Sequence, residues 1–460
     1  MAVGTSNENH QIKNIENITG TYLADTITGN SSVNTLKGGE GTDILSGEAG
    51  DDYLDGGIGD DTLKGGAGND NLIGGDGTDT VDYSDASENL IVNITDGSHF
   101  ISTSQGTDTF SSIEGVIGGT GDDTLTGNSG ANTLIGNAGN DTLIGAGTTN
   151  STEIDYLDGG EGTDFVSFSD RTSGITLDLS NTSAQDTDAN ASNDLIIQNI
   201  ENAQGGSGDD KITGNSSNNE LKGADGDDTF FASLGNDTID GGANTATGDK
   251  VDYSTLSSGV SITGNGGGSY TVTKSSGTDT LTNIENIIGT NHDDTLIGNA
   301  GSDIINGGAG NDTISGGAGN DTINGGTGND TIVFDAADLI INGGDGIDTL
   351  LISEENTTIN FGTFDSSKFE SIEVIDMTGN GAQSLTNLST SDVLDIINDT
   401  VMTDKGLVIN GDSDDSVSLT ATGWTNSGTT TQDGINYNVY SFFDTNGNHD
   451  LLIQNDITIL

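Results

Sequence analysis

Cysteine and proline are absent from this 460-residue chain, and basic residues are scarce. Without cysteine, neither disulfides nor thiolate metal sites are available. Only 10 lysines and arginines stand against 73 aspartates and glutamates, so the formal net charge is −63. Such an acidic surface excludes nucleic acid as a partner and favours cations.

Apolar sequence is also limited, because hydrophobic residues make up only 30% of the chain. No stretch approaches the 18 apolar residues of a membrane span, so we expect no membrane insertion. The first residues, MAVGTSNENHQIKNIEN, lack the charged and apolar regions of a secretory signal peptide, and any export signal is expected elsewhere. Low hydrophobicity with high charge normally predicts disorder. Order must therefore come from repetition, from counter-ions, or from both.

A nine-residue repeat is the dominant feature of the sequence. From Gly38 the chain divides without a slip into GGEGTDILS, GEAGDDYLD, GGIGDDTLK, GGAGNDNLI and GGDGTDTVD, and two looser units start at Gly20 and Gly29. Further runs begin at Gly118, Gly205 and Gly289, and later single units at Gly159 and Gly343. The pattern is GGxGxDxUx, where U is apolar, and no single unit of this size can bury its own apolar face.

Each position of the repeat has a physical reading. Glycines at positions 1, 2 and 4 allow positive φ and a tight turn. The last three residues form a minimal strand with one side chain pointing inward. In the first run the inward residues are Leu45, Leu54, Leu63, Leu72 and Val81. Stacked turns would bring them into one narrow apolar seam.

A longer period surrounds these runs. After each run come an apolar strand, such as VDYS at Val81, and a stretch of alternating β-type sequence. Each unit then reaches a shared tag: IENI, IEGV, IENA, IENI and IEVI, starting at Ile15, Ile113, Ile200, Ile284 and Ile372, which lie 98, 87, 84 and 88 residues apart. The spacing predicts four tandem β modules that stack in a solenoid. We place an N-terminal segment at 1–18, the modules at 19–111, 112–198, 199–282 and 283–375, and a β-rich C-terminal cap at 376–460; SDVLDIINDTVMT, from Ser391, is the one plausible short helix.

Position 6 of the repeat is the candidate metal ligand. A hard cation such as Ca²⁺ takes about six to eight oxygen ligands at roughly 2.3–2.6 Å, whereas Mg²⁺ demands stricter octahedral geometry. A glycine-rich turn exposes carbonyls, and one carboxylate per turn supplies charge, so two stacked turns offer an oxygen cage for Ca²⁺. The candidate ligands are Asp43, Asp52, Asp61, Asp70, Asp79, Asp123, Asp141, Asp164, Asp210, Asp228, Asp237, Asp294, Asp303, Asp312, Asp321, Asp330 and Asp348.

These runs resemble the RTX (haemolysin-type) calcium-binding nonapeptide-repeat family. The resemblance implies an all-β fold of parallel β-roll modules, in which two nonapeptides make one coil and each Ca²⁺ lies between the turns of repeats n and n+2. The implied pairs that share an ion are Asp43 with Asp61, Asp52 with Asp70, Asp61 with Asp79, Asp294 with Asp312, Asp303 with Asp321, and Asp312 with Asp330. The terminal LLIQNDITIL is similar to the uncleaved C-terminal signals of type I secretion substrates.

Two features depart from the family pattern or lie outside it. Asparagine replaces the position-6 aspartate at Asn34, Asn132 and Asn219, each in a unit that begins GN, and the missing charge predicts weak or empty sites there. The segment Asp444-Thr-Asn446-Gly-Asn448-His-Asp450 has alternate oxygen donors like the start of an EF-hand loop, but it lacks the later glycine and glutamate. It is either a cation loop or a hydrogen-bonded turn.

The functional expectation is an extracellular, non-enzymatic protein that binds several calcium ions: a surface-layer, matrix or adhesion component. Histidines are few and scattered, and acid pairs are too abundant to indicate glycosidase chemistry. We expect the metal-free chain to be largely disordered and to fold on calcium after export by the type I secretion machinery. Self-assembly and cell-surface polysaccharide are the other expected partners. The rival is an accessory protein or module of a secreted polysaccharide-modifying enzyme or hydrolase.

Overall fold

A computed structural model describes residues 15–95, 105–145, 154–188, 194–379, 381–397, 406–420, 422–443 and 448–460. These residues fall into two compact units, one mainly of residues 1–229 with 242–245 and the other of 230–241 with 246–460. Short β-strands dominate both units. Among the described residues, no helix has the length and apolar character that crossing a membrane requires.

The nonapeptides form the coils of a parallel β-roll, as the sequence predicts. In the first unit Leu36 pairs in register with Leu54, and Leu45 pairs with Leu63. Each partner lies 18 residues away, so two nonapeptides complete one coil. The inward residues Leu45, Leu54, Leu63, Leu72 and Val81 are all 0% exposed. This seam is the core, and it confirms the inward face of the repeat.

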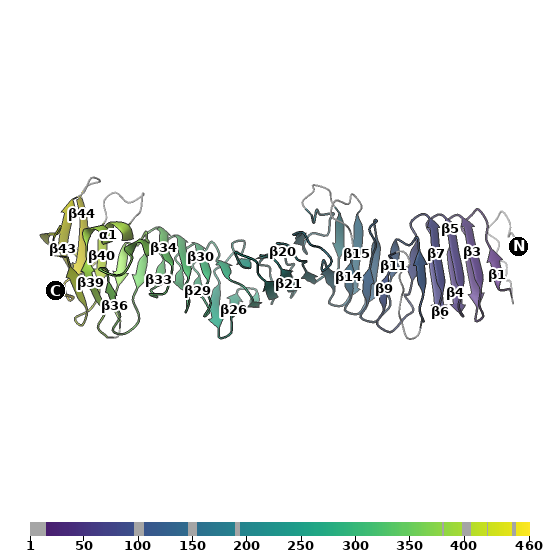
Figure 1. Ribbon diagram of the computed structural model, residues 1–460, viewed down its shortest axis with the longest axis horizontal. Helices are drawn as coiled ribbons and strands as arrows, with labels where there is room; N and C mark the ends of the chain where they lie inside the picture. The colour runs from purple at the N-terminus through teal and green to yellow at the C-terminus, as the bar shows by residue number, and fades with distance from the viewer. Residues whose placement is uncertain are drawn as a thin grey trace. The chain divides into compact units, whose positions relative to one another are not determined.

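Two parallel sheets run through the start of the first unit. One sheet contains β1 (Asn17–Thr19), β3 (Thr35–Glu40), β5 (Tyr53–Ile58), β7 (Asn71–Asp76) and β10 (Thr109–Ser111). The other contains β2 (Thr26–Asn30), β4 (Ile44–Ala49), β6 (Thr62–Ala67), β8 (Thr80–Asp82), β11 (Gly115–Ile117), β13 (Thr133–Ala138), β15 (Asp155–Glu161) and β18 (Leu195–Gln198). In Figure 1, β3, β5 and β7 lie side by side as adjacent rungs.

The rest of the first unit repeats this parallel pairing. One series contains β9 (Ile91–Asn93), β12 (Thr124–Thr126), β14 (Thr142–Ile144), β16 (Phe165–Ser167), β19 (Asn202–Gln204) and β21 (Glu220–Asp225). Another pairs β17 (Thr176–Asp178) with β20 (Lys211–Thr213). Two strands, β22 (Thr229–Phe231) and β23 (Thr238–Ala243), contain the points where the chain passes between units.

The second unit has three parallel series. The first is β24 (Lys250–Asp252), β28 (Asn286–Ile288), β30 (Ile304–Ala309), β32 (Thr322–Thr327), β34 (Ile340–Asp345) and β37 (Phe369–Glu370). The second is β25 (Ser261–Asn265), β29 (Thr295–Ile297), β31 (Thr313–Ser315), β33 (Thr331–Val333), β35 (Thr349–Leu351), β38 (Val374–Asp376), β40 (Leu407–Asn410) and β44 (Asn448–Gln454). The third is β36 (Thr358–Asn360), β39 (Ser384–Leu388), β41 (Ser416–Leu419) and β45 (Thr458–Ile459).

Antiparallel strands and the only helical turns of the described residues interrupt this unit. β26 (Ser269–Lys274) and β27 (Gly277–Thr282) form a hairpin, as do β42 (Thr425–Gln432) and β43 (Ile435–Phe443). The 3₁₀ turn η1 spans Ser366–Lys368, and α1 spans Thr390–Ile396, where Ser389 and Asp392 form a capping box. The predicted helix near Ser391 is therefore confirmed as far as Ile396, and residues 398–403 of the predicted segment lie outside the described residues. The β-rich C-terminal segment is confirmed too, and β40, β41, β44 and β45 extend the parallel stacking into it. The division into four modules stays a prediction.

Glycine is required where one turn lies directly on the next. Gly39 and Gly41, at positions 2 and 4 of a repeat, both have φ of +119°. A Cβ on Gly39 would collide with the carbonyl oxygen of Thr21, in the turn one coil earlier. Glycine is therefore favoured at these two positions, because the backbones of neighbouring coils are in contact and the left-handed backbone strains other residues.

Candidate metal centre

All seventeen predicted aspartates are buried in the turns, and none is more than 4% exposed. We call this set the aspartate ladder. Each follows a glycine turn and immediately precedes a strand, so its position on the coil is fixed by the same register that stacks the leucines. Burying a carboxylate is costly unless hydrogen bonds or a cation compensate it.

In most ladder carboxylates one oxygen accepts a backbone N–H from the neighbouring coil. The backbone N–H of Asp43 donates to Oδ1 of Asp61 at 2.7 Å, and that of Asp61 donates to Oδ1 of Asp79 at 2.8 Å. The other implied pairs are joined in the same way, at 2.7 Å for Asp52 and Asp70, 2.8 Å for Asp294 and Asp312, 2.9 Å for Asp303 and Asp321, and 2.8 Å for Asp312 and Asp330. The structure thus brings all six pairs together. That each pair shares an ion stays a prediction.

The second oxygen is different. In the described part of the chain, the buried Oδ2 atoms of several ladder aspartates have no hydrogen-bond partner: Asp43, Asp52, Asp61, Asp70, Asp79, Asp141, Asp164, Asp312 and Asp330. A Cβ on Gly56 would meet both Oδ2 of Asp61 and, at 2.7 Å, the carbonyl oxygen of Gly74 one coil later. A carboxylate oxygen and a carbonyl oxygen therefore both lie next to Gly56, in the space that a side chain would fill.

This arrangement fits Ca²⁺. Orphaned carboxylate oxygens beside backbone carbonyls are the hard oxygen ligands that Ca²⁺ takes. Among the described residues, no three histidine or acidic side chains gather around one point. Carbonyls of the glycine turns would therefore have to supply the oxygens that the aspartates do not. A bound Ca²⁺ would neutralise the carboxylates, while the chain's own turns hold the oxygens in place.

Comparison with known families supports this reading. A family model described as the RTX calcium-binding nonapeptide repeat matches residues 19–54, 55–85, 117–150, 151–169, 204–239, 213–248, 288–323 and 308–338. The chain carries RTX repeats. The matched residues include every aspartate of the ladder except Asp348. Asp348 nevertheless continues the ladder, because the backbone N–H of Asp330 donates to its Oδ1 at 2.8 Å.

No curated protein matches the chain. Among solved structures, the extracellular lipase LipA from Serratia marcescens is similar at 19% identity and a TM-score of 0.15. The similarity covers 57% of this chain, and this chain spans 38% of the length of that lipase.

Burial changes the acidity of the RTX aspartates. Loss of solvent raises the pKa of Asp43 and Asp79 to about 6 and that of Asp70, Asp141 and Asp312 to about 7. In each case the hydrogen bond from the preceding coil opposes the rise without cancelling it. Without metal, these five aspartates are therefore expected to bind protons near neutral pH, because protonation removes the buried negative charge that a cation would otherwise balance.

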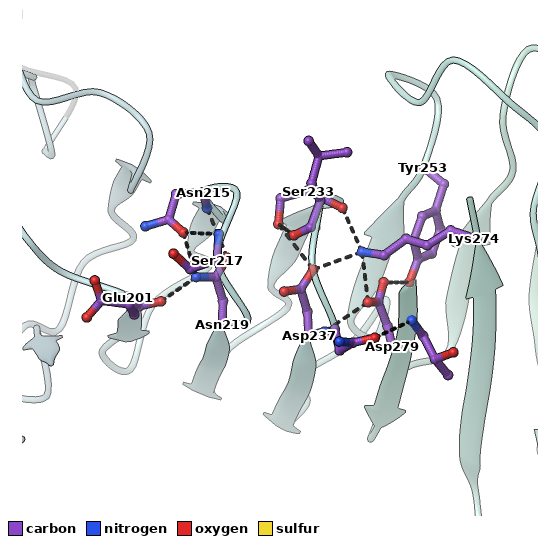
Figure 2. A network of polar contacts seen from close by, with 12 residues as sticks. Glu201, Asn215, Ser217, Asn219, Ser233, Asp237, Tyr253, Lys274 and Asp279 are labelled. Atoms are coloured by element: carbon purple, nitrogen blue, oxygen red, sulfur yellow. Dashed lines mark hydrogen bonds and ion pairs between the residues drawn. The ribbon is translucent and has the colours of Figure 1, made fainter. Parts of the chain in front are cut away.

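At Asn132 and Asn219 the side-chain amide donates hydrogen bonds where an aspartate would offer only acceptor oxygens. Nδ2 of Asn132 donates to Oδ1 of Asn128 at 3.1 Å, and Nδ2 of Asn219 donates to Oδ1 of Asn215 at 3.0 Å and to the carbonyl oxygen of Glu201 at 2.5 Å (Figure 2). Asn34 keeps its place in the ladder through its N–H, which donates to Oδ1 of Asp52 at 2.6 Å. These contacts give a physical reason for the weak sites predicted there.

Asp237 differs from the other predicted ligands because it already faces a cation from the chain itself, and its binding of Ca²⁺ stays a prediction. Figure 2 shows the ammonium of Lys274, on β26, between two carboxylates. Its Nζ lies 2.9 Å from Oδ2 of Asp237 and 2.7 Å from Oδ1 of Asp279, and the lysine side chain is 1% exposed. Asp237 is thus the one predicted ligand, among the described residues, whose carboxylate is paired with a lysine. The ammonium leaves little reason for Ca²⁺ to bind there.

Sequence reasoning missed several acidic residues that occupy ladder positions. Asp25 and Asp155 stand four residues before the glycine that opens the next repeat, so counting back nine residues from Gly29 or Gly159 would have found them. Asp108 accepts the N–H of Asp70 at 2.9 Å, and its other oxygen accepts the Tyr83 hydroxyl at 2.7 Å. No nine-residue count reaches Asp108, because a long insertion precedes it. Of the EF-hand-like segment 444–450, residues 444–447 lie outside the described residues.

Proposed function

We propose that this protein is an extracellular structural protein whose coils are assembled by calcium. The observation that carries the proposal is the row of buried Oδ2 atoms without hydrogen-bond partners, each facing the backbone of a glycine turn. A polypeptide with a formal charge of −63 that buries such a row needs cations in the folded state. Low calcium inside a cell would keep the chain unfolded, and calcium at the outside concentration would fold it.

The proposed role is that of a surface-layer, matrix or adhesion component without catalytic activity. Export by a type I secretion system fits a chain that folds only after it meets calcium. The outward strand positions carry many threonines, asparagines and acidic residues, which suit contact with ions, water and polysaccharide rather than with an apolar partner.

A calcium titration of the purified chain tests the proposal. Far-ultraviolet circular dichroism and light scattering would be followed from chelator into millimolar Ca²⁺, with Mg²⁺ at equal ionic strength as the control. We expect a cooperative gain of β-sheet signal and loss of hydrodynamic volume with Ca²⁺ only. Equal β-sheet content in chelator would overturn the folding proposal.

The structural role needs a separate test. Calcium-dependent assembly into sheets or fibres, or calcium-dependent retention on cells, would support a surface role. The folded chain would also be offered polysaccharide, ester and peptide substrates. Turnover of any of them would contradict the non-catalytic part of the proposal and favour an enzyme-associated role.

A further inference from the structure

The Ile-Glu tags are hidden repeats that continue the ladder. Counting back nine residues from Gly118, Gly205 and Gly289 places Glu114, Glu201 and Glu285 at position 6. The strand after each glutamate pairs in parallel with the strand after the last aspartate of the preceding run; for example, Gly115 pairs with Thr80. These three tags, and the fourth at Ile372, lie outside the residues that the family model matches.

Each tag glutamate makes the contact that a ladder aspartate would make. The N–H of Asp79 donates to Oε2 of Glu114 at 2.9 Å, and the N–H of Asp164 donates to Oε2 of Glu201 at 3.0 Å. The same bond joins Asp249 to Glu285 at 2.9 Å and Asp348 to Glu373 at 2.8 Å. Every carboxylate series that reaches a tag therefore passes from aspartate to glutamate at that point.

The tags also supply the carbonyl that a glycine turn would supply. The residue before the isoleucine has a left-handed backbone, with φ of 52° at Ser112 and 50° at Asn199. A Cβ on Gly74 would meet the carbonyl oxygen of Ser112 together with Oδ2 of Asp79. A Cβ on Gly159 would likewise meet the carbonyl oxygen of Asn199 together with Oδ2 of Asp164. This repeats the construction at Gly56, with the tag in place of the next glycine turn.

Two unpartnered oxygens mark these positions as cation sites. Asp79 and Asp164 are 0% exposed, and within the described residues their Oδ2 atoms have no hydrogen-bond partner. Each shares its glycine with the tag carbonyl, and each belongs to an aspartate whose N–H donates to the tag glutamate. A neutral structural contact would not need two carboxylates; a divalent cation would balance both.

We propose that Glu114 and Glu201 are Ca²⁺ ligands that complete the last site of their runs, with Asp79 and Asp164 as the partner carboxylates. Glu285 and Glu373 accept the N–H groups of Asp249 and Asp348 in the same position. The proposal rests on calcium binding by the aspartate ladder. It extends calcium binding to the Ile-Glu tag, which recurs once per long period. The last aspartate of each run would then share an ion with the tag glutamate instead of remaining without a cation.

Crystals of the full chain grown in Ca²⁺, measured at a long wavelength for anomalous scattering, test the proposal site by site. We expect peaks between the ladder aspartates, and also between Asp79 and Glu114 and between Asp164 and Glu201. Glu114→Gln and Glu201→Gln should each lose only the matching peak. Glu161→Gln, at an exposed turn position, is the matched control and should lose none.

The possible failures are distinguishable. Peaks along the ladder but none beside Glu114 and Glu201 would overturn this inference and leave the proposed function intact. A folded chain without any peak in the turns would overturn both. If a glutamine variant did not fold, the map of the unsubstituted protein would decide alone.

Discussion

At the scale of single residues, the repeat places two adjacent aspartates of equal charge in different surroundings, one buried in the ladder and one exposed. Asp61 is buried with an unpartnered Oδ2, whereas its neighbour Asp60 is exposed and its Oδ1 accepts the N–H of Thr78. Asp61→Asn keeps the Oδ1 acceptor and removes the charge. We expect the calcium concentration at half-folding to rise about tenfold, which corresponds to ~1.4 kcal/mol.

Asp60→Asn is the control, because it removes the same charge from the adjacent position. Its calcium midpoint should stay close to that of the unsubstituted chain. Equal shifts for the two variants, measured by circular dichroism, would show that net charge alone sets the midpoint and that Asp61 is not a ligand.

A second prediction concerns residues that strain the glycine turn. Position 2 of the repeat has positive φ, and at Ala224 a residue with a Cβ holds φ of +84°. Ala224→Gly should stabilise the calcium-loaded protein by about 1 kcal/mol, since a left-handed backbone costs roughly that much outside glycine. Thermal unfolding in Ca²⁺ measures the change. Ala67→Gly, at a turn position outside the positive-φ set, should give no gain; stabilisation by both changes would contradict the argument from strain.

At the scale of elements, the β26–β27 hairpin delivers a cation to the ladder. The ammonium of Lys274, on β26, lies against the carboxylates of Asp237 and Asp279. Oδ2 of Asp279 also accepts a hydrogen bond from the buried hydroxyl of Tyr253 at 3.1 Å. Lys274→Met should destabilise the protein by about 3–5 kcal/mol, because it leaves two buried carboxylates without their counter-charge. Chemical denaturation in saturating Ca²⁺ would measure the loss.

Lys211→Met serves as the control for that change, since Lys211 is exposed at the start of β20. It should shift stability by well under 1 kcal/mol. A Lys274→Met variant as stable as this control would mean that the ammonium does not compensate the carboxylates.

The sequence predicts most of the regular coils and little of what interrupts them. Phase and spacing were enough to place Leu45 and Leu63 on the inward face, because a fixed nine-residue frame determines which face each residue occupies. The six aspartate pairs followed only from the resemblance to the RTX family, in which repeats n and n+2 are neighbours, and the structure brings them together. The frame is lost across insertions, so it could not reveal that Lys274 pairs with Asp237, 37 residues away, or that Tyr83 donates to Asp108. Those contacts depend on how a hairpin or an insertion folds back, which local periodicity does not encode.

At the scale of the whole molecule, burial of the ladder makes folding depend on pH with opposite signs in the absence and presence of calcium. Burial raises the pKa from 3.8 to about 6 for Asp43 and to about 7 for Asp70. A raised pKa means that the folded state binds protons more tightly than the unfolded state. Without metal, that contribution to stability is present at low pH and is lost as pH rises through about 6 to 7.

We therefore expect the chain in chelator to gain β-sheet signal when the pH falls from 8 to 5. In Ca²⁺ the order reverses, because protons compete for the same oxygens, and the calcium midpoint should rise as the pH falls. Circular dichroism across this range, with and without metal, measures both effects. A chelated chain that is equally unfolded at pH 5 and pH 8 would be inconsistent with the raised pKa values.

The amide of Asn219, the ammonium of Lys274 and the phenol of Tyr83 each close off a stretch of carboxylates with a group that no chelator can remove. These groups stay in place when calcium is removed. Loss of an ion should therefore destabilise neighbouring sites within the same stretch but not the sites beyond the next such group. Each stretch should therefore fold and unfold cooperatively as a unit, and calcium withdrawal should unfold first the stretches with the fewest consecutive aspartates.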